Sequence, residues 1–155
     1  MILKLSLFLH VLSAIFWIGG MLFLSLIIVP FLLALKSPQE KSAVYRKIGP
    51  KYRTLAWVAI VVLLITGPIN LYLLGINPAQ ILDPEFLATG YGKALLIKLI
   101  LVFALVSSSL LHDFWVGPKA RNSEKFRTYA KIFGRGNLIM ALLIVLFAVF
   151  IRTGG

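Results

Sequence analysis

Four long runs of apolar residues divide the chain, and the polar residues gather in the three segments between them. About 20 consecutive apolar residues in a helix are enough to cross the hydrocarbon core of a bilayer. The runs predict membrane-spanning helices at about 3–35, 53–74, 91–116 and 135–151. We therefore expect an all-α fold, an integral membrane four-helix bundle in which residues 1–155 form a single transmembrane domain.

The two halves of the chain follow the same plan. Each consists of an apolar run, a basic segment and a second apolar run. Such a plan is typical of the parallel repeats found in some membrane transporters. The pattern thus indicates two helix pairs of like orientation, although few residues are identical between the halves.

The composition agrees with a membrane protein and excludes several kinds of site. Hydrophobic residues make up 60% of the chain and charged residues 14%, whereas a soluble domain has roughly 45–50% and about 25%. The chain has no cysteine, which excludes disulfides, thiolate metal sites and iron–sulfur clusters.

The formal net charge of +11 is concentrated in two of the three connecting segments. The middle segment, 75–90, contains Asp83 and Glu85 and no basic residue. Because Lys and Arg favour the cytoplasmic side of short loops, the first and third segments are expected to be cytoplasmic loops, with both termini outside. The basic residues of these two segments are Lys36, Lys41, Arg46, Lys47, Lys51, Arg53, Lys119, Arg121, Lys125, Arg127, Lys131 and Arg135.

The distribution of the basic residues also indicates which kind of molecule they bind. Nucleic-acid binding would need extended basic arms with aromatic residues between the charges, and the sequence lacks them, so we expect no nucleic acid. Anionic lipid headgroups suit basic loops at a membrane surface. We expect the lipid bilayer as partner and a multi-pass location in the plasma (inner) membrane of a prokaryote.

Three ionisable residues fall inside the predicted helices: His10, Lys98 and His112. Such a residue costs about 2.5–3.5 kcal/mol at the bilayer centre and is a functional candidate for that reason. At 1.5 Å per residue, His10 and Lys98 both lie about 10 Å from the outer ends of their helices, and His112 lies about 21 Å deeper than Lys98. One metal ion therefore cannot bind both His10 and His112 within one subunit. His10 and Lys98 are able to bind it together, and His10 with water or with a side chain of a partner is the alternative, so His112 is the less favoured ligand.

Residues around these two predict a pocket in the outer half of the bilayer. Ser6, His10, Ser13, Trp17 and Gly20 form one stripe of the first helix, and small and polar residues on a stripe are typical of a surface that packs against a helix or cofactor. The second helix brings two polar residues to the same level. The expected pocket residues are His10, Asn70, Tyr72 and Lys98, with Trp17 beside them.

Haem is the cofactor that these residue types fit. Neutral imidazole commonly binds haem iron, and a lysine with a free lone pair supplies a second ligand. Alternatively, Lys98 or Arg152 pairs with a haem propionate. Copper prefers thiolate or thioether ligands, and the chain offers only Met1, Met21 and Met140. Hydrolytic chemistry is not indicated, because paired carboxylates and a Ser–His–Asp spacing are missing.

Each candidate also has a purely structural interpretation, which the sequence leaves open. His10 would then hydrogen-bond a neighbouring helix, and Trp17 would fill the core. Lys98 would extend its amine to the outer interface. His112, which precedes Asp113 and Trp115, would belong to the belt of interfacial residues.

Two segments carry a resemblance to known families. The first is Leu9-His10-Val11 through Trp17-Ile18-Gly19-Gly20-Met21, which resembles the first helix of the copper-resistance protein D-like (CopD-like) membrane family. The second is Tyr91 to Leu99 (YGKALLIKL), which resembles the G-x-x-L-x-x-K-L signature of a later helix of that family. The same segments are similar to HemJ-type protoporphyrinogen oxidases, four-helix proteins of like length. In those, a histidine of the first helix and a lysine of the third are implicated in haem b binding, and the resemblance assigns these roles to His10 and Lys98.

We therefore expect a haem b-binding membrane protein that acts in haem handling, haem transport or electron transfer. The alternatives are a HemJ-like protoporphyrinogen oxidase (an oxidoreductase), a transporter of copper or another small solute, and a non-catalytic subunit of a membrane complex. A homodimer is a candidate assembly, because four helices barely enclose a porphyrin and the stripe of the first helix offers a surface for a second copy.

Overall fold

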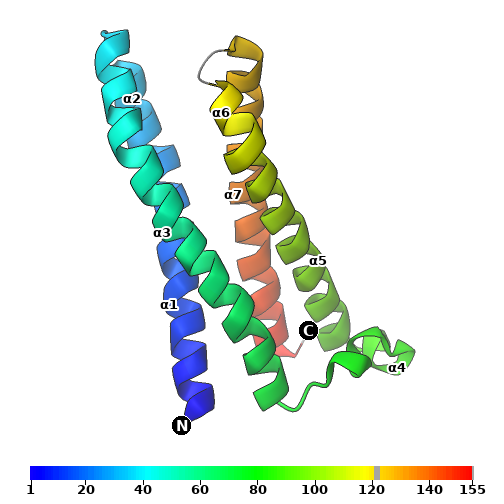
Figure 1. Cartoon of the computed structure of the whole chain (residues 1–155). Helices are drawn as coiled ribbons and strands as arrows, with labels where there is room; N and C mark the ends of the chain where they lie inside the picture. The colour runs from blue at the N-terminus through cyan, green and yellow to red at the C-terminus, as the bar shows by residue number, and fades with distance from the viewer. Residues whose placement is uncertain (121–122, 155) are drawn as a thin grey trace. The chain divides into compact units, whose positions relative to one another are not determined.

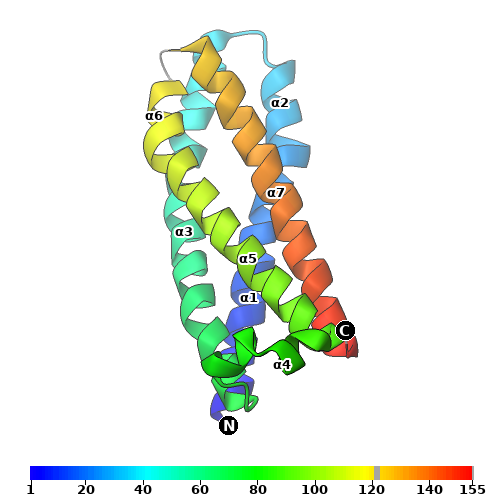
Figure 2. The same cartoon turned by 90° about the vertical axis from the view of Figure 1, so that its right-hand side faces the viewer.

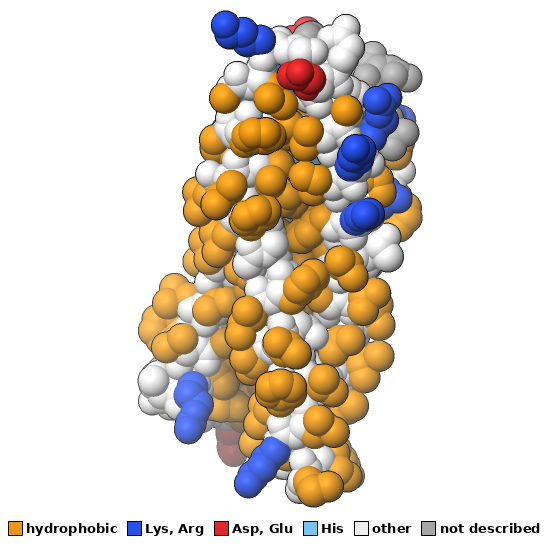
Figure 3. Space-filling view, turned by 90° about the vertical axis from the view of Figure 1, so that its left-hand side faces the viewer, with side chains coloured by type: hydrophobic (Ala, Val, Ile, Leu, Met, Phe, Trp, Pro, Cys, Tyr) orange, Lys and Arg blue, Asp and Glu red, His pale blue; other side chains and the backbone are white. Residues whose placement is uncertain are grey.

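A computed structural model describes residues 1–120 and 123–154, the side chain of Pro38 excepted. Within that part of the chain, four helices are long and apolar enough to cross a membrane: Ile2–Ala34, Gln39–Leu73, Gly90–Ala120 and Glu124–Thr153. On the face drawn in Figure 3, hydrophobic side chains cover the middle and the Lys and Arg side chains lie toward the ends. The predicted all-α, four-helix membrane fold is confirmed, and the chain is a multi-pass membrane protein.

The chain divides into two compact units, Met1–Leu74 and Gly75–Gly155. In the first unit, α1 (Ile2–Phe23), a π-helical turn (Leu24–Ile28) and α2 (Val29–Ala34) follow one another without a break. After three residues the chain turns into α3 (Pro38–Leu73), which packs against α1. Figure 1 shows these two helices side by side, with the N-terminus and the end of α3 at the same end of the unit.

The second unit opens with two short helical pieces, a 3-10 turn (Pro78–Leu82) and α4 (Pro84–Ala88). Its first long span consists of α5 (Gly90–Leu111), a π-helical turn (His112–Val116) and α6 (Gly117–Ala120). The return span is α7 (Glu124–Thr153). Figures 1 and 2 show α5 and α7 side by side, with the C-terminus near the beginning of α5.

The first long span has the same construction in both units. In each, a 22-residue α-helix leads into a five-residue π-helical turn, and a proline (Pro30 or Pro118) is the second residue after that turn. A proline has no N–H to donate, and its ring clashes with the carbonyl four residues earlier. Those carbonyls belong to Leu26 and Phe114, in the middle of each turn. The wider π geometry accommodates the proline and keeps the span continuous.

Side-chain caps and glycines explain where the helices begin and end. Thr89 accepts a hydrogen bond from the Gly92 amide at 2.9 Å and caps α5, and Ser37 does the same for α3 through the Glu40 amide at 3.3 Å. Gly75 and Gly154, which follow α3 and α7, have φ angles of +84° and +101°. Glycine adopts this left-handed backbone without steric cost, so it terminates a helix readily.

The predicted bounds of two helices were wrong at their basic ends. The second helix begins at Pro38 instead of near residue 53, and the fourth begins at Glu124 instead of near residue 135. The expected basic loops are therefore mostly helix. Apolar runs mark only the membrane-embedded part, whereas Lys, Arg, Glu and Gln are themselves good helix formers, and Pro38 suits the first position of a helix.

Candidate functional site

His10 is held between α1 and α3 by a hydrogen bond to Thr66. Its Nδ1 lies 2.7 Å from Thr66 Oγ1, and the same hydroxyl donates to the Val62 carbonyl at 2.6 Å. A hydroxyl has one proton, and here it points to Val62. His10 Nδ1–H is therefore the donor to Thr66, so the lone pair of the neutral ring is on Nε2.

The ring of His10 also lies against a glycine of α3. A Cβ atom at Gly67 would be 3.6 Å from His10 Cε1, which is ordinary van der Waals contact. Cε1 is the ring carbon between the two nitrogens, so a larger side chain at position 67 would press on this edge of the imidazole. Gly67 and Thr66 together fix both the position and the tautomer of His10.

Two polar side chains lie one helical turn away from this pair, Ser6 on α1 and Asn70 on α3. They are 7% and 6% exposed, and Ser6 Oγ and Asn70 Oδ1 have no hydrogen-bond partner among the described residues. A buried polar atom without a partner costs about 1–3 kcal/mol. Each helix therefore has a buried polar atom, one turn from His10 or Thr66, that a bound molecule or water would satisfy.

Further along α1, a tyrosine of α3 reaches across to the helix backbone. The Tyr52 hydroxyl donates to the Trp17 carbonyl at 3.0 Å. The Tyr52 ring packs so closely on Gly20 that a Cβ atom there would overlap it. The Trp17 side chain itself is buried. The stripe Ser6–His10–Ser13–Trp17–Gly20 therefore faces α3, and it is not the surface for a second copy that the sequence analysis expected.

Lys98 has the corresponding position in the second unit. A shift of 88 residues carries the π-helical turn at Leu24 onto that at His112 and Pro30 onto Pro118. The same shift carries His10 onto Lys98, each eight residues after the first residue of its helix. Lys98 is half-buried, and its amine has no hydrogen-bond or ion-pair partner in the described part of the chain.

Comparison with known proteins gives the family. The family model of copper resistance protein D matches residues 46–151. The chain belongs to the copper resistance protein D (CopD) family. It is also 39% identical over 152 residues to an uncharacterized protein of Aquifex aeolicus (strain VF5), across 97% of this chain and 96% of that protein. No solved structure matches the chain.

One of the predicted pocket residues of this CopD-family chain, Tyr72, does not lie in the α1–α3 interface. Tyr72 is 75% exposed, because it is two residues beyond Asn70 and a helical turn takes 3.6 residues. It therefore points to nearly the opposite face of α3 from Asn70. Arg152 is exposed near the end of α7. The sequence analysis had matched Tyr72 to the pocket by its depth along the helix, without considering the face of the helix.

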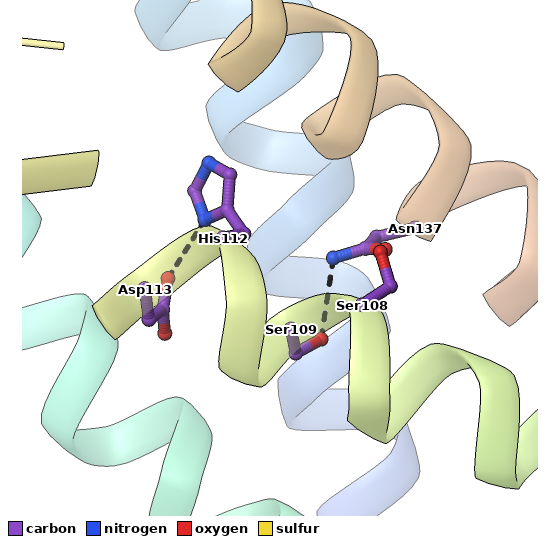
Figure 4. A network of polar contacts seen from close by, with 5 residues as sticks. All are labelled: Ser108, Ser109, His112, Asp113 and Asn137. Atoms are coloured by element: carbon purple, nitrogen blue, oxygen red, sulfur yellow. Dashed lines mark hydrogen bonds and ion pairs between the residues drawn. The ribbon is translucent and has the colours of Figure 1, made fainter. Parts of the chain in front are cut away.

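His112 belongs to a separate polar cluster in the second unit (Figure 4). Its Nδ1 lies 2.7 Å from the Asp113 carboxylate. Nearby, Ser108 Oγ donates to Asn137 Oδ1 at 2.5 Å, and Asn137 Nδ2 donates to Ser109 Oγ at 3.2 Å. These bonds join α5 to α7.

Several of these residues were missed at the sequence level. Thr66 had a signal, since it lies four residues before Asn70 on the same helical face. The run Ser107–Ser109 and Asn137 were also visible as polar residues within apolar helices. Tyr52 had no such signal, because it was placed in a loop.

No group of three or more His, Asp or Glu side chains that would hold a metal ion occurs within the described ranges. With no cysteine and three methionines, this CopD chain has few of the soft ligands that copper prefers. Haem makes a smaller demand, because its porphyrin supplies four iron ligands and the protein supplies one or two. The donor set of the first unit fits haem better than it fits a bare metal ion.

Proposed function

We propose that this CopD-family protein binds haem b and acts in haem handling or electron transfer, with His10 as an axial ligand through Nε2. The observation that carries the proposal is the Thr66 hydroxyl on His10 Nδ1. Metal-bound histidines nearly always donate their second N–H to a protein acceptor, which fixes the ring and raises its basicity. The expected location is the inner membrane of a prokaryote, in keeping with a bacterial relative.

Two buried polar atoms near His10 support a ligand with a polar edge. Ser6 Oγ and Asn70 Oδ1 are buried without partners one turn away, so they are able to hydrogen-bond a bound molecule or its water. Haem b, when bound, would supply one-electron chemistry. We assign Lys98 as the second ligand or as a propionate partner, because it has the position in its own helix that His10 has in α1. Arg152 is a further candidate for a propionate.

The test is the haem content of the purified protein, expressed with a haem precursor supplied. We expect the wild type to show a Soret band and His10→Ala to lose it. His112→Ala is the matched control, since it removes the other histidine, and it should keep the band. A colourless wild-type protein, or a His10→Ala variant with full haem content, contradicts the proposal.

The family description favours copper transport as a second candidate. In that case the purified protein would contain copper without haem, and cells that express it would accumulate copper. Metal analysis of the same preparation separates the two candidates, because iron and copper are measured together.

Three further possibilities are refinements of the leading one or alternatives to it. A HemJ-like oxidation of protoporphyrinogen would show as conversion of that substrate by the haem-loaded protein. A non-catalytic subunit would co-purify with a partner and carry no cofactor. A homodimer would show in the mass of the detergent-solubilised particle.

A further inference from the structure

A groove of about 400 Å³ lies between α1 and α3 at the basic end of the first unit. Its walls are mostly apolar and come from both helices, and two lysines of α3 complete the rim. The volume is in the range of small-molecule sites in proteins. The residues that matter for its chemistry are Phe23, Leu24, Ile48, Leu55, Lys47 and Lys51.

The groove owes its form to features already described. Gly20 leaves space that the Tyr52 ring enters, and the Tyr52 hydroxyl is bonded to the Trp17 carbonyl. Leu24, on the wall, is the first residue of the π-helical turn, where the helix is wider than an α-helix. Gly20, Tyr52 and Leu24 all line the groove. The close Gly20–Tyr52 contact and the widened turn therefore border it.

Charge and polarity are arranged along the groove in a definite order. Lys47 and Lys51 are four residues apart, so they lie on one face of α3, and both are exposed. Leu55 follows one turn later, about 6 Å further along the helix axis, where the apolar run of α3 begins. The groove lining contains no acidic residue.

We propose that this groove binds an anionic phospholipid, with its phosphate at Lys47 and Lys51 and an acyl chain along Phe23, Leu24 and Leu55. A phospholipid has the same order of groups, an anionic headgroup at the interface and apolar chains beneath it. Basic pockets between membrane helices on the cytoplasmic side bind such headgroups. The site is independent of His10 and of the proposed haem.

The second unit offers a matched control. Lys131 and Arg135 of α7 are also four residues apart and exposed. Gly20, however, corresponds to Ser108 by the shift of 88 residues. Ser108 is hydrogen-bonded to Asn137 of α7, so at this crossing a polar bond joins the helices where the first unit has a glycine. The second unit thus has a basic pair of the same charge as Lys47 and Lys51, but it lacks the contact between Gly20 and Tyr52.

The experiment is native mass spectrometry of the full-length protein in detergent, titrated with phosphatidylglycerol or with phosphatidylcholine of the same acyl chains. We expect preferential binding of phosphatidylglycerol. Lys47→Gln/Lys51→Gln should weaken it about 30-fold, because each basic residue near the surface contributes about 1 kcal/mol. Lys131→Gln/Arg135→Gln should leave the affinity unchanged. These four side chains are exposed, so the substitutions leave the helix packing intact.

A second variant tests the apolar part of the site. Leu55→Trp fills the groove and keeps both lysines, and it should also weaken phosphatidylglycerol binding. Equal losses in the two double variants, equal binding of the two lipids, or full displacement of the lipid by inorganic phosphate would each overturn the proposal. Retained binding in Leu55→Trp would overturn the groove as the acyl-chain site.

Discussion

One hydroxyl group determines which nitrogen of His10 carries the proton. Thr66 donates its proton to Val62 and so is left to accept from His10 Nδ1. The bond fits a structural role, in which His10 joins α1 to α3, and a ligand role, in which Nε2 would bind iron. At the level of single residues, the two roles are therefore separated by the effect of Thr66 on haem affinity.

Thr66→Val keeps the shape of the side chain and removes the acceptor. Haem affinity should fall by about 10–100-fold, which is the usual effect of losing the hydrogen-bond partner of a metal ligand. The measurement is a spectrophotometric titration of the haem-free protein. Thr54→Val is the control, since Thr54 bonds only the Pro50 carbonyl of its own helix. Unchanged affinity in Thr66→Val would contradict the assigned role.

Asn137 carries the polar contacts between α5 and α7. Asn137→Ala removes its bonds to Ser108 and Ser109 and should lower the free energy of unfolding by about 1–2 kcal/mol, given about 0.6 kcal/mol for an average bond between membrane helices. Reversible unfolding in mixed micelles measures this. Thr153→Val, whose hydroxyl bonds only within α7, should have no effect, and an equal loss there would refute the interpretation.

At the scale of elements, the sequence predicted the four spans but not their true lengths. The apolar pattern reports contact with lipid, and helix formation continues past it into the basic segments. The two π-helical turns were also not predicted, because they depend on where a proline falls within a helix that packing keeps continuous. The depth of His10 and Lys98 in the membrane stays a prediction, which rests on counting residues from the ends of their helices. The exposure of Tyr72 was not predicted, because it depends on which face of α3 packs against α1.

The crossing of α1 and α3 depends on a single glycine of a Gly-Gly pair. Gly20→Ala would place a methyl group in the Tyr52 ring, and overpacking of this kind costs about 1–3 kcal/mol. Gly19→Ala is the control in the neighbouring position, where a Cβ atom meets nothing within 4 Å. Unfolding of both variants in mixed micelles gives the comparison. Equal stability of the two would show that the close contact is unimportant.

At the scale of the whole molecule, the charges predict the orientation of the chain in its membrane. The 36-residue helix α3 is about 54 Å long, whereas the hydrocarbon core is about 30 Å thick. The basic end of α3 therefore extends beyond the membrane. By the bias of Lys and Arg this end is expected on the cytoplasmic side, with both termini outside.

Single cysteines test this orientation, because the natural chain has none. Glu85→Cys, in α4, should react with a membrane-impermeant maleimide in intact cells. Lys125→Cys, near the start of α7, should react only after permeabilisation. Both positions are exposed, so the protein itself shields neither cysteine from the reagent. The reverse labelling pattern would contradict the predicted orientation.

The most direct test of the central claim is chemical rescue of His10. In His10→Gly the side chain is removed and a space the size of an imidazole remains beside Thr66. We expect this variant to lose the Soret band and to regain it when imidazole and haem are added to the solubilised protein. If the band persists without imidazole, or fails to return with it while the protein remains folded, His10 is not the ligand.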